Sequence, residues 1–217
     1  MDLTLFESES RPLSGVEYLA LGSVVLRQFA TSNEAEILNA IKVVENVAPF
    51  RHMITPGGFR MSAAMTNCGS FGWVSERSGY RYDAMNRETG KPWPPMPDVF
   101  LKLAHDAAAE AGFADFIPDG CLINCYEPGA KLSLHQDKDE QDKTQPIVSV
   151  SLGLPAVFLF GCERRDERPQ RIPLTHGDVV VWGGLSRLSY HGVMPLKDGS
   201  HPLTGAYRMN LTFRRAR

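Results

Sequence analysis

The chain has 217 residues, of which 43% are hydrophobic and 22% charged, the composition of an ordinary globular domain. Its net charge of −2 gives no overall attraction to nucleic acid, so any polyanion would have to meet a local basic patch. No apolar run approaches the roughly 20 residues that span a bilayer, and the acidic start lacks the features of a secretory signal. With four cysteines and no C-x-x-C pair, we expect reduced thiols in a cytoplasmic, monomeric protein with a single domain, residues 1–217.

Two helices are predicted in the first half of the chain. The first covers TSNEAEILNAIKVVENVA, residues 31–48, where Thr31 and Glu34 have the spacing of a capping box. Its apolar stripe at helical spacing consists of Ile37, Leu38, Ile41 and Val44. The second helix is predicted from about Asp98 to Ala111, with Gly112 as its stop. We therefore treat residues 15–50 as a supporting N-terminal segment.

Residues 51–96 differ in composition from both helices. They are rich in Gly, Pro and aromatic residues, with short extended pieces such as RMSAAMTNCG, which favours hairpins and a mobile cover over core. Met65, Trp73, Tyr80 and Tyr82 lie in this segment. The aromatic rings either staple a small hairpin together or clamp a flat ligand.

From Gly120 onward the chain consists of short predicted strands separated by turns. The segments are CLINCYEP, KLSLHQD, PIVSVSLGLPAVFLFG, RIPLTHGDVVVWGG, SRLSYHGV and YRMNLTFRR. Their close spacing predicts an antiparallel barrel or a double-sheet jelly roll, with the two helices packed outside. The predicted fold class is α+β with a mainly β core, and residues 97–217 form a helix plus this core.

A histidine and an acid share one face of a predicted strand. In KLSLHQDKDE, His135 and Asp137 are two residues apart, and alternate side chains of an extended chain point the same way. Taken alone, such a pair is more often the solvated end of a strand than a metal site. His191, in SYHGV, adds a second imidazole after several strands. Two imidazoles and one carboxylate leave positions open on Fe(II) for a cosubstrate and O2, but a zinc hydrolase uses the same ligand types.

The last predicted strand, RMNLTFR, alternates between apolar and polar residues. Its polar face carries Arg208, Asn210, Thr212 and Arg214. Two arginines around an asparagine favour a small dianion, because guanidinium groups bind carboxylates in a bidentate way. The arginines are six residues apart, roughly 20 Å at ~3.3 Å per residue, and would reach opposite ends of the ligand. Asn124 and Tyr126 share a face of LINCYEP and offer it neutral hydrogen bonds, although each of these groups could instead be a satisfied polar group of the core.

In combination these motifs resemble the AlkB family of iron- and 2-oxoglutarate-dependent dioxygenases. The segments that carry the resemblance are TPGGFRMSAAMTNCG, SGYRY, KPWPPMP, NCYEPGAKLSLHQDKDE, PIVSVSLGLPAVFLFG, HGDVVVWGG, YHGV and RMNLTFR. The resemblance implies a double-stranded β-helix under a nucleotide-recognition lid, residues 51–96. It implies Fe(II) at three catalytic residues, namely His135, Asp137 and His191. The residues implied for 2-oxoglutarate are Asn124, Tyr126, Arg208, Asn210 and Arg214.

The same resemblance implies a substrate and a reaction. Trp73 and the ring of His135 would sandwich a flipped base, with Tyr80 toward the backbone phosphate and Asp139 at the base edge. Further implied substrate contacts are Met65 and Arg165. The expected activity is oxidative demethylation of 1-methyladenine and 3-methylcytosine, in single-stranded DNA by preference, with double-stranded DNA and RNA as further candidates. Decarboxylation of 2-oxoglutarate with O2 is coupled to hydroxylation of the methyl group, which leaves as formaldehyde beside succinate and CO2.

Two other functions are compatible with parts of the sequence. A dioxygenase of the same fold that acts on protein or small molecules would lack the aromatic lid. A metal-binding jelly roll without catalysis would not need the two arginines of RMNLTFR. A further cluster is either a contact for a polyanion or a solvated loop, and it consists of Arg164, Arg165, Arg168 and Arg171.

Overall fold

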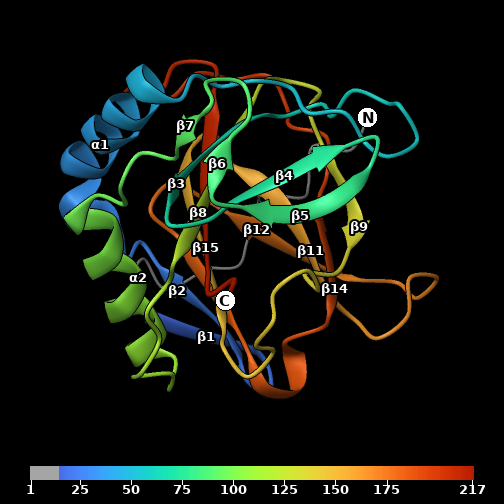
Figure 1. Cartoon of the computed structure of the whole chain (residues 1–217). Coiled ribbons are helices and arrows are strands. Elements are labelled where there is room, and N and C mark those ends of the chain that lie inside the picture. Colours follow the sequence, from blue (N-terminus) through green and yellow to red (C-terminus); the bar gives the residue numbers. More distant parts are fainter. Residues whose placement is uncertain (1–14) are drawn as a thin grey trace.

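Two antiparallel sheets face each other and form the jelly roll that the sequence predicts (Figure 1). The structure, a computed structural model, describes residues 15–217, and the acidic start of the chain lies outside them. The seven-stranded sheet contains, in spatial order, β1 (Gly15–Ala20), β2 (Ser23–Arg27), β13 (Val179–Trp182), β10 (Ile147–Gly153), β15 (Arg208–Arg214), β8 (Gly120–Tyr126) and β3 (Ala64–Gly69). The four-stranded sheet contains β12 (Gln170–Leu174), β11 (Ala156–Cys162), β14 (Tyr190–Val193) and β9 (Leu132–His135).

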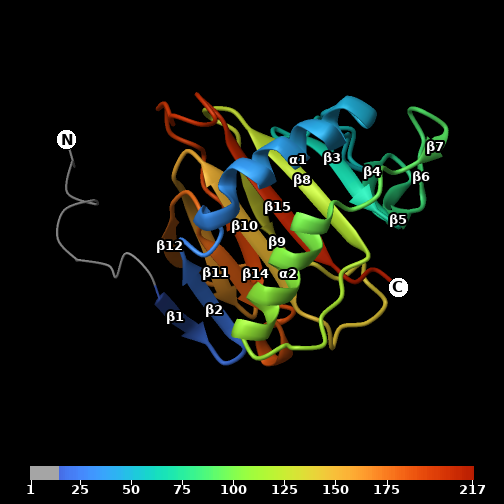
Figure 2. The ribbon, with the colours of Figure 1, turned by 90° about the vertical axis from the view of Figure 1, so that its left-hand side faces the viewer.

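The two helices cover the outer face of the seven-stranded sheet, as Figure 2 shows. They are α1 (Glu34–Val47) and α2 (Asp98–Glu110), and short 3-10 turns occupy Thr31–Asn33 and Gly184–Ser186. Ile37 of α1 and Phe100 of α2 are fully buried in one apolar cluster with Leu211 and Phe213 of β15. The apolar face of RMNLTFR therefore packs against the helices, and its polar face is turned toward the second sheet. No helix among residues 15–217 is long and apolar enough to cross a membrane.

The start of α1 differs from the predicted capping box. Thr31 belongs to the preceding 3-10 turn, and its hydroxyl donates to the backbone oxygen of Gln28 at 2.7 Å. Glu34 is the first residue of α1 and bonds to Nε2 of His176, 2.8 Å away, rather than to the backbone at the helix start. The carboxylate of Glu34, which the local pattern assigned to the helix cap, thus bonds to a residue far away in the sequence. The end of α2 agrees with the prediction, because Gly112 has the left-handed φ of +89° that favours glycine after a helix.

The segment predicted as a lid contains two parts with different positions in the fold. β3 is the edge strand of the seven-stranded sheet and pairs with β8 along its whole length. The rest forms two small hairpins, β4 (Gly72–Glu76) with β5 (Gly79–Asp83), and β6 (Met85–Asn86) with β7 (Lys91–Pro92). We call β4–β5, residues 72–83, the lid hairpin. Gly72 permits the close packing of this hairpin against Trp93, because a Cβ at this position would lie 2.4 Å from the ring of Trp93.

Candidate active site

The three predicted metal ligands come together at the edge of the four-stranded sheet. His135 ends β9, His191 lies on β14, and the two residues are direct partners in the antiparallel pairing. Asp137 follows β9 by two residues, and one ligand atom from each of the three lies within 4.8 Å of the others. Nε2 of His135 is 3.7 Å from Oδ1 of Asp137, and Nε2 of His191 is 3.8 Å from its Oδ2. This spacing suits one shared cation.

Backbone carbonyls fix the orientation of both imidazoles. Nδ1 of His135 lies 2.9 Å from the backbone oxygen of Ser133, and Nδ1 of His191 lies 3.1 Å from that of Ser189. A carbonyl accepts only from N–H, so each Nδ1 carries the hydrogen and each Nε2 presents a lone pair. Burial, aided by the neighbouring His135, lowers the pKa of His191 to about 3. His191 is therefore a neutral ligand near pH 7.

Asp137 is held as an ionised ligand by a buried arginine. Nη2 and Nε of Arg214 donate to its Oδ2 at 2.7 and 2.9 Å. Burial raises the pKa of Asp137, but Arg214 and the two imidazoles outweigh burial and hold the pKa well below its usual range. The fixed Oδ2 leaves Oδ1 on the side of His135. In this structure Arg214, which the sequence assigned to the cosubstrate, orients the metal ligand.

Gly192 sets the distance between the two histidine strands. A Cβ at this position would lie 2.6 Å from the backbone oxygen of Leu132 and 3.2 Å from the backbone nitrogen of Leu134, so β9 and β14 could not approach as closely. For Gly192→Ala we expect affinity for a divalent cation to fall about 10–100-fold, the usual loss when a group that orients metal ligands is removed. Titration with Co(II) or Mn(II) measures it. Gly57→Ala is the control, because its Cβ would meet the Phe59 ring at 3.4 Å and Oγ1 of Thr55 at 3.9 Å, both side-chain contacts. Equal affinity in both variants would show that the strand spacing is not critical.

Arg208 is the group on β15 that most needs an anionic partner. It is 1% exposed, and its Nη2 donates to Oγ of Ser151 at 2.8 Å. Its buried Nε and Nη1 have no acceptor among residues 15–217, and the guanidinium carbon lies 5.1 Å from the centroid of the Tyr126 ring. Leaving buried charged donors unpaired is costly, and a carboxylate would pair both of them. The socket formed by Arg208 and Tyr126 therefore fits one carboxylate of 2-oxoglutarate.

The two asparagines of this interior have different surroundings. Oδ1 of Asn124 is buried without a described donor, whereas its Nδ2 donates to Oδ1 of Asn210 at 3.4 Å. The amide of Asn210 donates to Oγ of Ser149 and to the backbone oxygen of Val150, both at 2.9 Å. Thr212 donates to Oδ1 of Asn210 at 3.1 Å. Asn210 thus accepts from Asn124 and is itself held by its own hydrogen bonds. Oδ1 of Asn124 is the acceptor that has no donor among the described residues.

The lid hairpin contacts the loop that carries the metal ligand. Trp73 stacks on Tyr80, with ring centroids 5.4 Å apart and an interplanar angle of 14°. The indole Nε1 of Trp73 donates to Oδ2 of Asp139 at 2.8 Å. Asp139 is two residues beyond Asp137, so this bond links the predicted base clamp to the metal loop. The Trp73–Tyr80 stack agrees with the interpretation that the aromatic rings hold the hairpin together. The bond from Trp73 to Asp139 in addition connects the hairpin to the loop that carries Asp137.

The remaining predicted contacts, Met65 and Arg165, lie in different environments. Met65 is 3% exposed on β3 and is the register partner of Asn124. Arg165 is exposed in the loop after β11. In that loop Arg164 pairs with Asp166 at 2.9 Å, and both side chains are more than 70% exposed. The structure places Met65 beside Asn124 of β8 and leaves Arg165 on a solvated loop.

Sequence reasoning missed two residues that hold the metal loop, Glu140 and Arg187. Glu140 is 4% exposed and accepts from the hydroxyl of Tyr82 at 2.6 Å and from Nη2 of Arg187 at 2.9 Å. Nη1 of Arg187 donates to the backbone oxygen of Asp137 at 2.6 Å. Glu140 ends the run DKDE, which as a sequence reads as solvated. No local pattern marks Arg187, because its partners lie more than 40 residues away.

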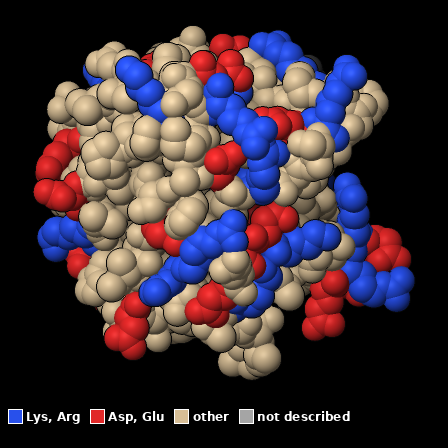
Figure 3. Space-filling view, in the orientation of Figure 1, with Lys and Arg blue, Asp and Glu red and all other residues tan. Residues whose placement is uncertain are grey.

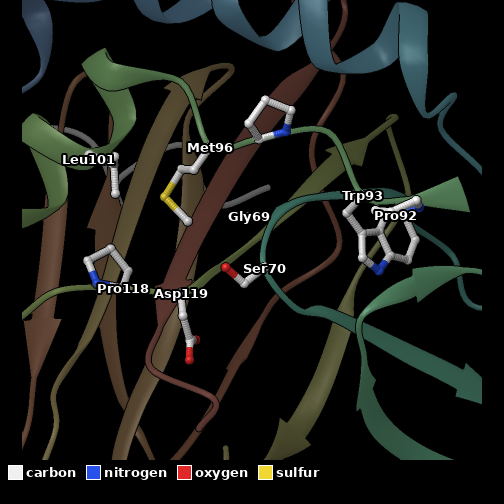
Figure 4. A pocket seen from close by; sticks show the side chains of 9 residues that line it. Gly69, Ser70, Pro92, Trp93, Met96, Leu101, Pro118 and Asp119 are labelled. Atoms are coloured by element: carbon white, nitrogen blue, oxygen red, sulfur yellow. The ribbon is translucent and has the colours of Figure 1, made fainter.

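A separate cavity of about 400 Å³ is lined by residues from the end of β3, the start of α2 and the loops beside them (Figure 4). Its lining is mostly apolar and includes Trp93, Met96 and Leu101. The carboxylate of Asp119, also in the lining, accepts from the backbone N–H groups of Ala216 and Arg217. None of the predicted site residues lines this cavity, and its one acid is already occupied.

Comparison with known proteins agrees with this geometry. The family model of the 2OG-Fe(II) oxygenase superfamily matches residues 22–214. The chain is 59% identical to the alpha-ketoglutarate-dependent dioxygenase AlkB of Salmonella typhimurium and 58% identical to that of Escherichia coli, in each case over 92% of this chain and 93% of the relative. The solved structure of OsALKBH1 superposes with a TM-score of 0.80 at 31% identity, covering 93% of this chain and all of that one.

These similarities decide between the two metals that the triad alone allows. The matched family uses Fe(II) and 2-oxoglutarate, and both the facial triad and the unpaired donors of Arg208 suit them. The zinc-hydrolase interpretation is therefore set aside. The chain belongs to the AlkB family of Fe(II)- and 2-oxoglutarate-dependent dioxygenases.

Proposed function

We propose that the protein is an oxidative demethylase that repairs 1-methyladenine and 3-methylcytosine, acting in the cytoplasm as a monomer. Its preferred substrate is single-stranded DNA, with double-stranded DNA and RNA as further substrates. The observation that carries the proposal is the bond from Trp73 to Asp139, which joins an aromatic surface to the loop of the metal ligand Asp137. The high identity to the AlkB dioxygenases supports it.

The methylated bases match the chemistry of this surface. Methylation at N1 of adenine or N3 of cytosine leaves a cation, which an electron-rich indole face such as that of Trp73 attracts beyond ordinary stacking. Tyr80 covers one face of Trp73, so the base would take the other face, with His135 on the opposite side. Because these lesions cannot form Watson–Crick pairs, extracting them costs less than extracting a normal base, and single strands avoid that cost.

Basic side chains around the lid hairpin would meet the phosphates. Figure 3 shows Lys and Arg interspersed with Asp and Glu on the face that carries β4 and β5. Arg77 lies exposed at the turn of the hairpin, and Arg81 and Arg87 are partly tied to Asp83 at 3.6 and 3.0 Å. Binding through a few such contacts should weaken as salt rises, without strong dependence on sequence.

Each part of the site would have one task in the reaction. His135, Asp137 and His191 would hold Fe(II), while the residues that would hold and orient 2-oxoglutarate are Asn124, Tyr126, Arg208, Asn210 and Arg214. When bound together, Fe(II) and 2-oxoglutarate would supply the oxidation of the methyl group by O2, with release of formaldehyde, succinate and CO2. The buried interior of the jelly roll would keep bulk water away from the reacting groups, and the lid hairpin would fix the base against the metal side.

The direct test is repair of a methylated oligonucleotide. Protein, Fe(II) and 2-oxoglutarate are mixed without oxygen with a single strand that contains one 1-methyladenine, and oxygen is then admitted. We expect the methyl group to be lost from the base, as followed by mass, with formaldehyde formed in equal amount. Omission of 2-oxoglutarate is the control. Consumption of 2-oxoglutarate with an unchanged base would point to a different substrate.

Asp139 is expected to set the preference among lesions. A carboxylate at the base edge accepts from the exocyclic amino group of adenine or cytosine, but guanine and thymine present a carbonyl there. Asp139→Asn should therefore slow repair of 1-methyladenine and 3-methylcytosine relative to 1-methylguanine and 3-methylthymine, by about 1–3 kcal/mol of discrimination. The ratios of kcat/KM in otherwise identical strands measure the effect. Unchanged ratios would leave Asp139 only as the acceptor of the Trp73 N–H.

A further inference from the structure

Two neighbouring carboxylates of the metal loop receive two donors from the lid hairpin. Trp73 and Tyr82 are direct cross-strand partners in β4–β5, so their side chains leave the same face of the hairpin. Nε1 of Trp73 donates to Asp139 at 2.8 Å, and the hydroxyl of Tyr82 donates to Glu140 at 2.6 Å. The first bond lies in an exposed position and the second is buried. The hairpin is thus fastened to the loop at two adjacent points.

The buried point is connected further, to both arginines that hold Asp137. Oε2 of Glu140 pairs with Nη2 of Arg187 at 2.9 Å, and its Oε1 lies 3.5 Å from Nε of Arg214. Arg187 holds the backbone oxygen of Asp137, and Arg214 holds its carboxylate. A short path of polar contacts therefore runs from the phenol of Tyr82 through Glu140 to both ends of the metal ligand.

Charge explains why an acid is needed at this position. Asp137 and Glu140 together balance the guanidinium groups of Arg187 and Arg214, and all four side chains are at most 8% exposed. Without Glu140, two buried cations would share one carboxylate, and that carboxylate is also the metal ligand. Removing one partner of a buried ion pair is strongly unfavourable because it leaves a charge uncompensated. Arg214 would then compete more strongly with a bound cation for Asp137.

We propose that Glu140 is a positioning residue that couples the lid hairpin to the metal ligand. It acts on Asp137 only through Arg187 and Arg214, and Tyr82 is the group through which the hairpin reaches it. Docking of the hairpin and the geometry of Asp137 are then parts of one arrangement. The role assigned to the hairpin rests on the proposed function, whereas the role of Glu140 toward the metal does not.

Glu140→Gln tests the metal half of the proposal without nucleic acid. We expect affinity for Co(II) or Mn(II), titrated into the full chain, to fall about tenfold or more, the range for lost partners of metal ligands. Asp178→Asn is the matched control, since Asp178 is a buried acid that pairs with buried Arg27 at 2.8 Å and is not part of the site. If both variants lose stability alike and both keep wild-type metal affinity, Glu140 has only a structural role.

Tyr82→Phe tests the hairpin half and keeps every ion pair of Glu140. We expect metal affinity close to wild type and a rise of about fivefold in 2-oxoglutarate consumed per methyl group removed, the equivalent of one hydrogen bond of ~1 kcal/mol. Tyr207→Phe, at an exposed tyrosine, is the control. An unchanged ratio in Tyr82→Phe would overturn the coupling, even if Glu140→Gln failed to fold. Absence of repair by the wild-type protein, with the Glu140→Gln metal effect present, would contradict the proposed function alone.

Discussion

His191→Ala is expected to abolish turnover and to remove most of the affinity for Fe(II). The imidazole is 4% exposed, neutral, and fixed by Ser189 with its Nε2 toward Asp137, so the substitution removes one of the three atoms that would bind the metal. Loss of an outer partner of a metal ligand already costs about 10–100-fold in affinity or activity, and loss of the ligand itself should exceed this. Metal titration of the variant and single-turnover repair of a methylated strand measure the two losses.

His201→Ala is the control for that substitution. His201 is only partly buried and stacks on His176, at a centroid distance of 4.5 Å, on a part of the fold that does not contact the metal ligands. It should bind Fe(II) and turn over as the wild type does. Repair by His191→Ala at the wild-type rate, with matched metal content, would remove His191 from the site.

Arg208→Met is expected to weaken the binding of 2-oxoglutarate strongly while leaving the stability of the fold almost unchanged or higher. The substitution removes a charged group that would pair with a carboxylate of 2-oxoglutarate, and loss of a buried charged partner usually costs about 2–5 kcal/mol. The Kd for 2-oxoglutarate should thus rise by a factor of roughly 30 to several thousand. The fold should lose little or become more stable, since Nε and Nη1 of Arg208 have no protein acceptor and no acid among the described residues is paired with it.

Arg27→Met provides the contrast. Arg27 is also buried, but it pairs with Asp178 and Glu17, so its removal leaves two carboxylates without their cation and should lower the melting temperature. Isothermal titration of 2-oxoglutarate and thermal melting of both variants separate the cases. An Arg208→Met protein that keeps the wild-type Kd would show that the socket next to Tyr126 holds something other than the cosubstrate.

The sequence was most informative where one strand carries the pattern by itself. The alternation in RMNLTFR correctly predicted that Leu211 and Phe213 pack on one side while Arg208 and Arg214 face the other. The prediction that His135 and Asp137 point the same way similarly depended only on an extended chain between them. The pairing of His135 with His191 followed from the expected jelly-roll topology, and the register of β9 with β14 agrees with it.

Prediction failed where the partner of a side chain lies far away in the chain. Glu34 was assigned to a helix cap and instead bonds to His176, 142 residues later. In the run DKDE, Lys138 and Asp139 are exposed while Asp137 and Glu140 are buried, a difference set by Arg187 and Arg214 rather than by local composition. β3 was predicted as an extended piece of the cover because residues 51–96 are rich in Gly, Pro and aromatic residues, and its pairing with β8 shows that it is also the edge strand of the large sheet.

The position of β15 has a consequence for how the protein is made. This strand is late in the chain, yet it lies between β10 and β8 near the centre of the seven-stranded sheet. During translation, β8 and β10 would have no partner for their facing edges until residue 214 has left the ribosome. A nascent or truncated chain that stops before Arg208 therefore lacks the strand that joins β10 to β8, and with it both Arg208 and the Arg214 side chain that holds the carboxylate of Asp137.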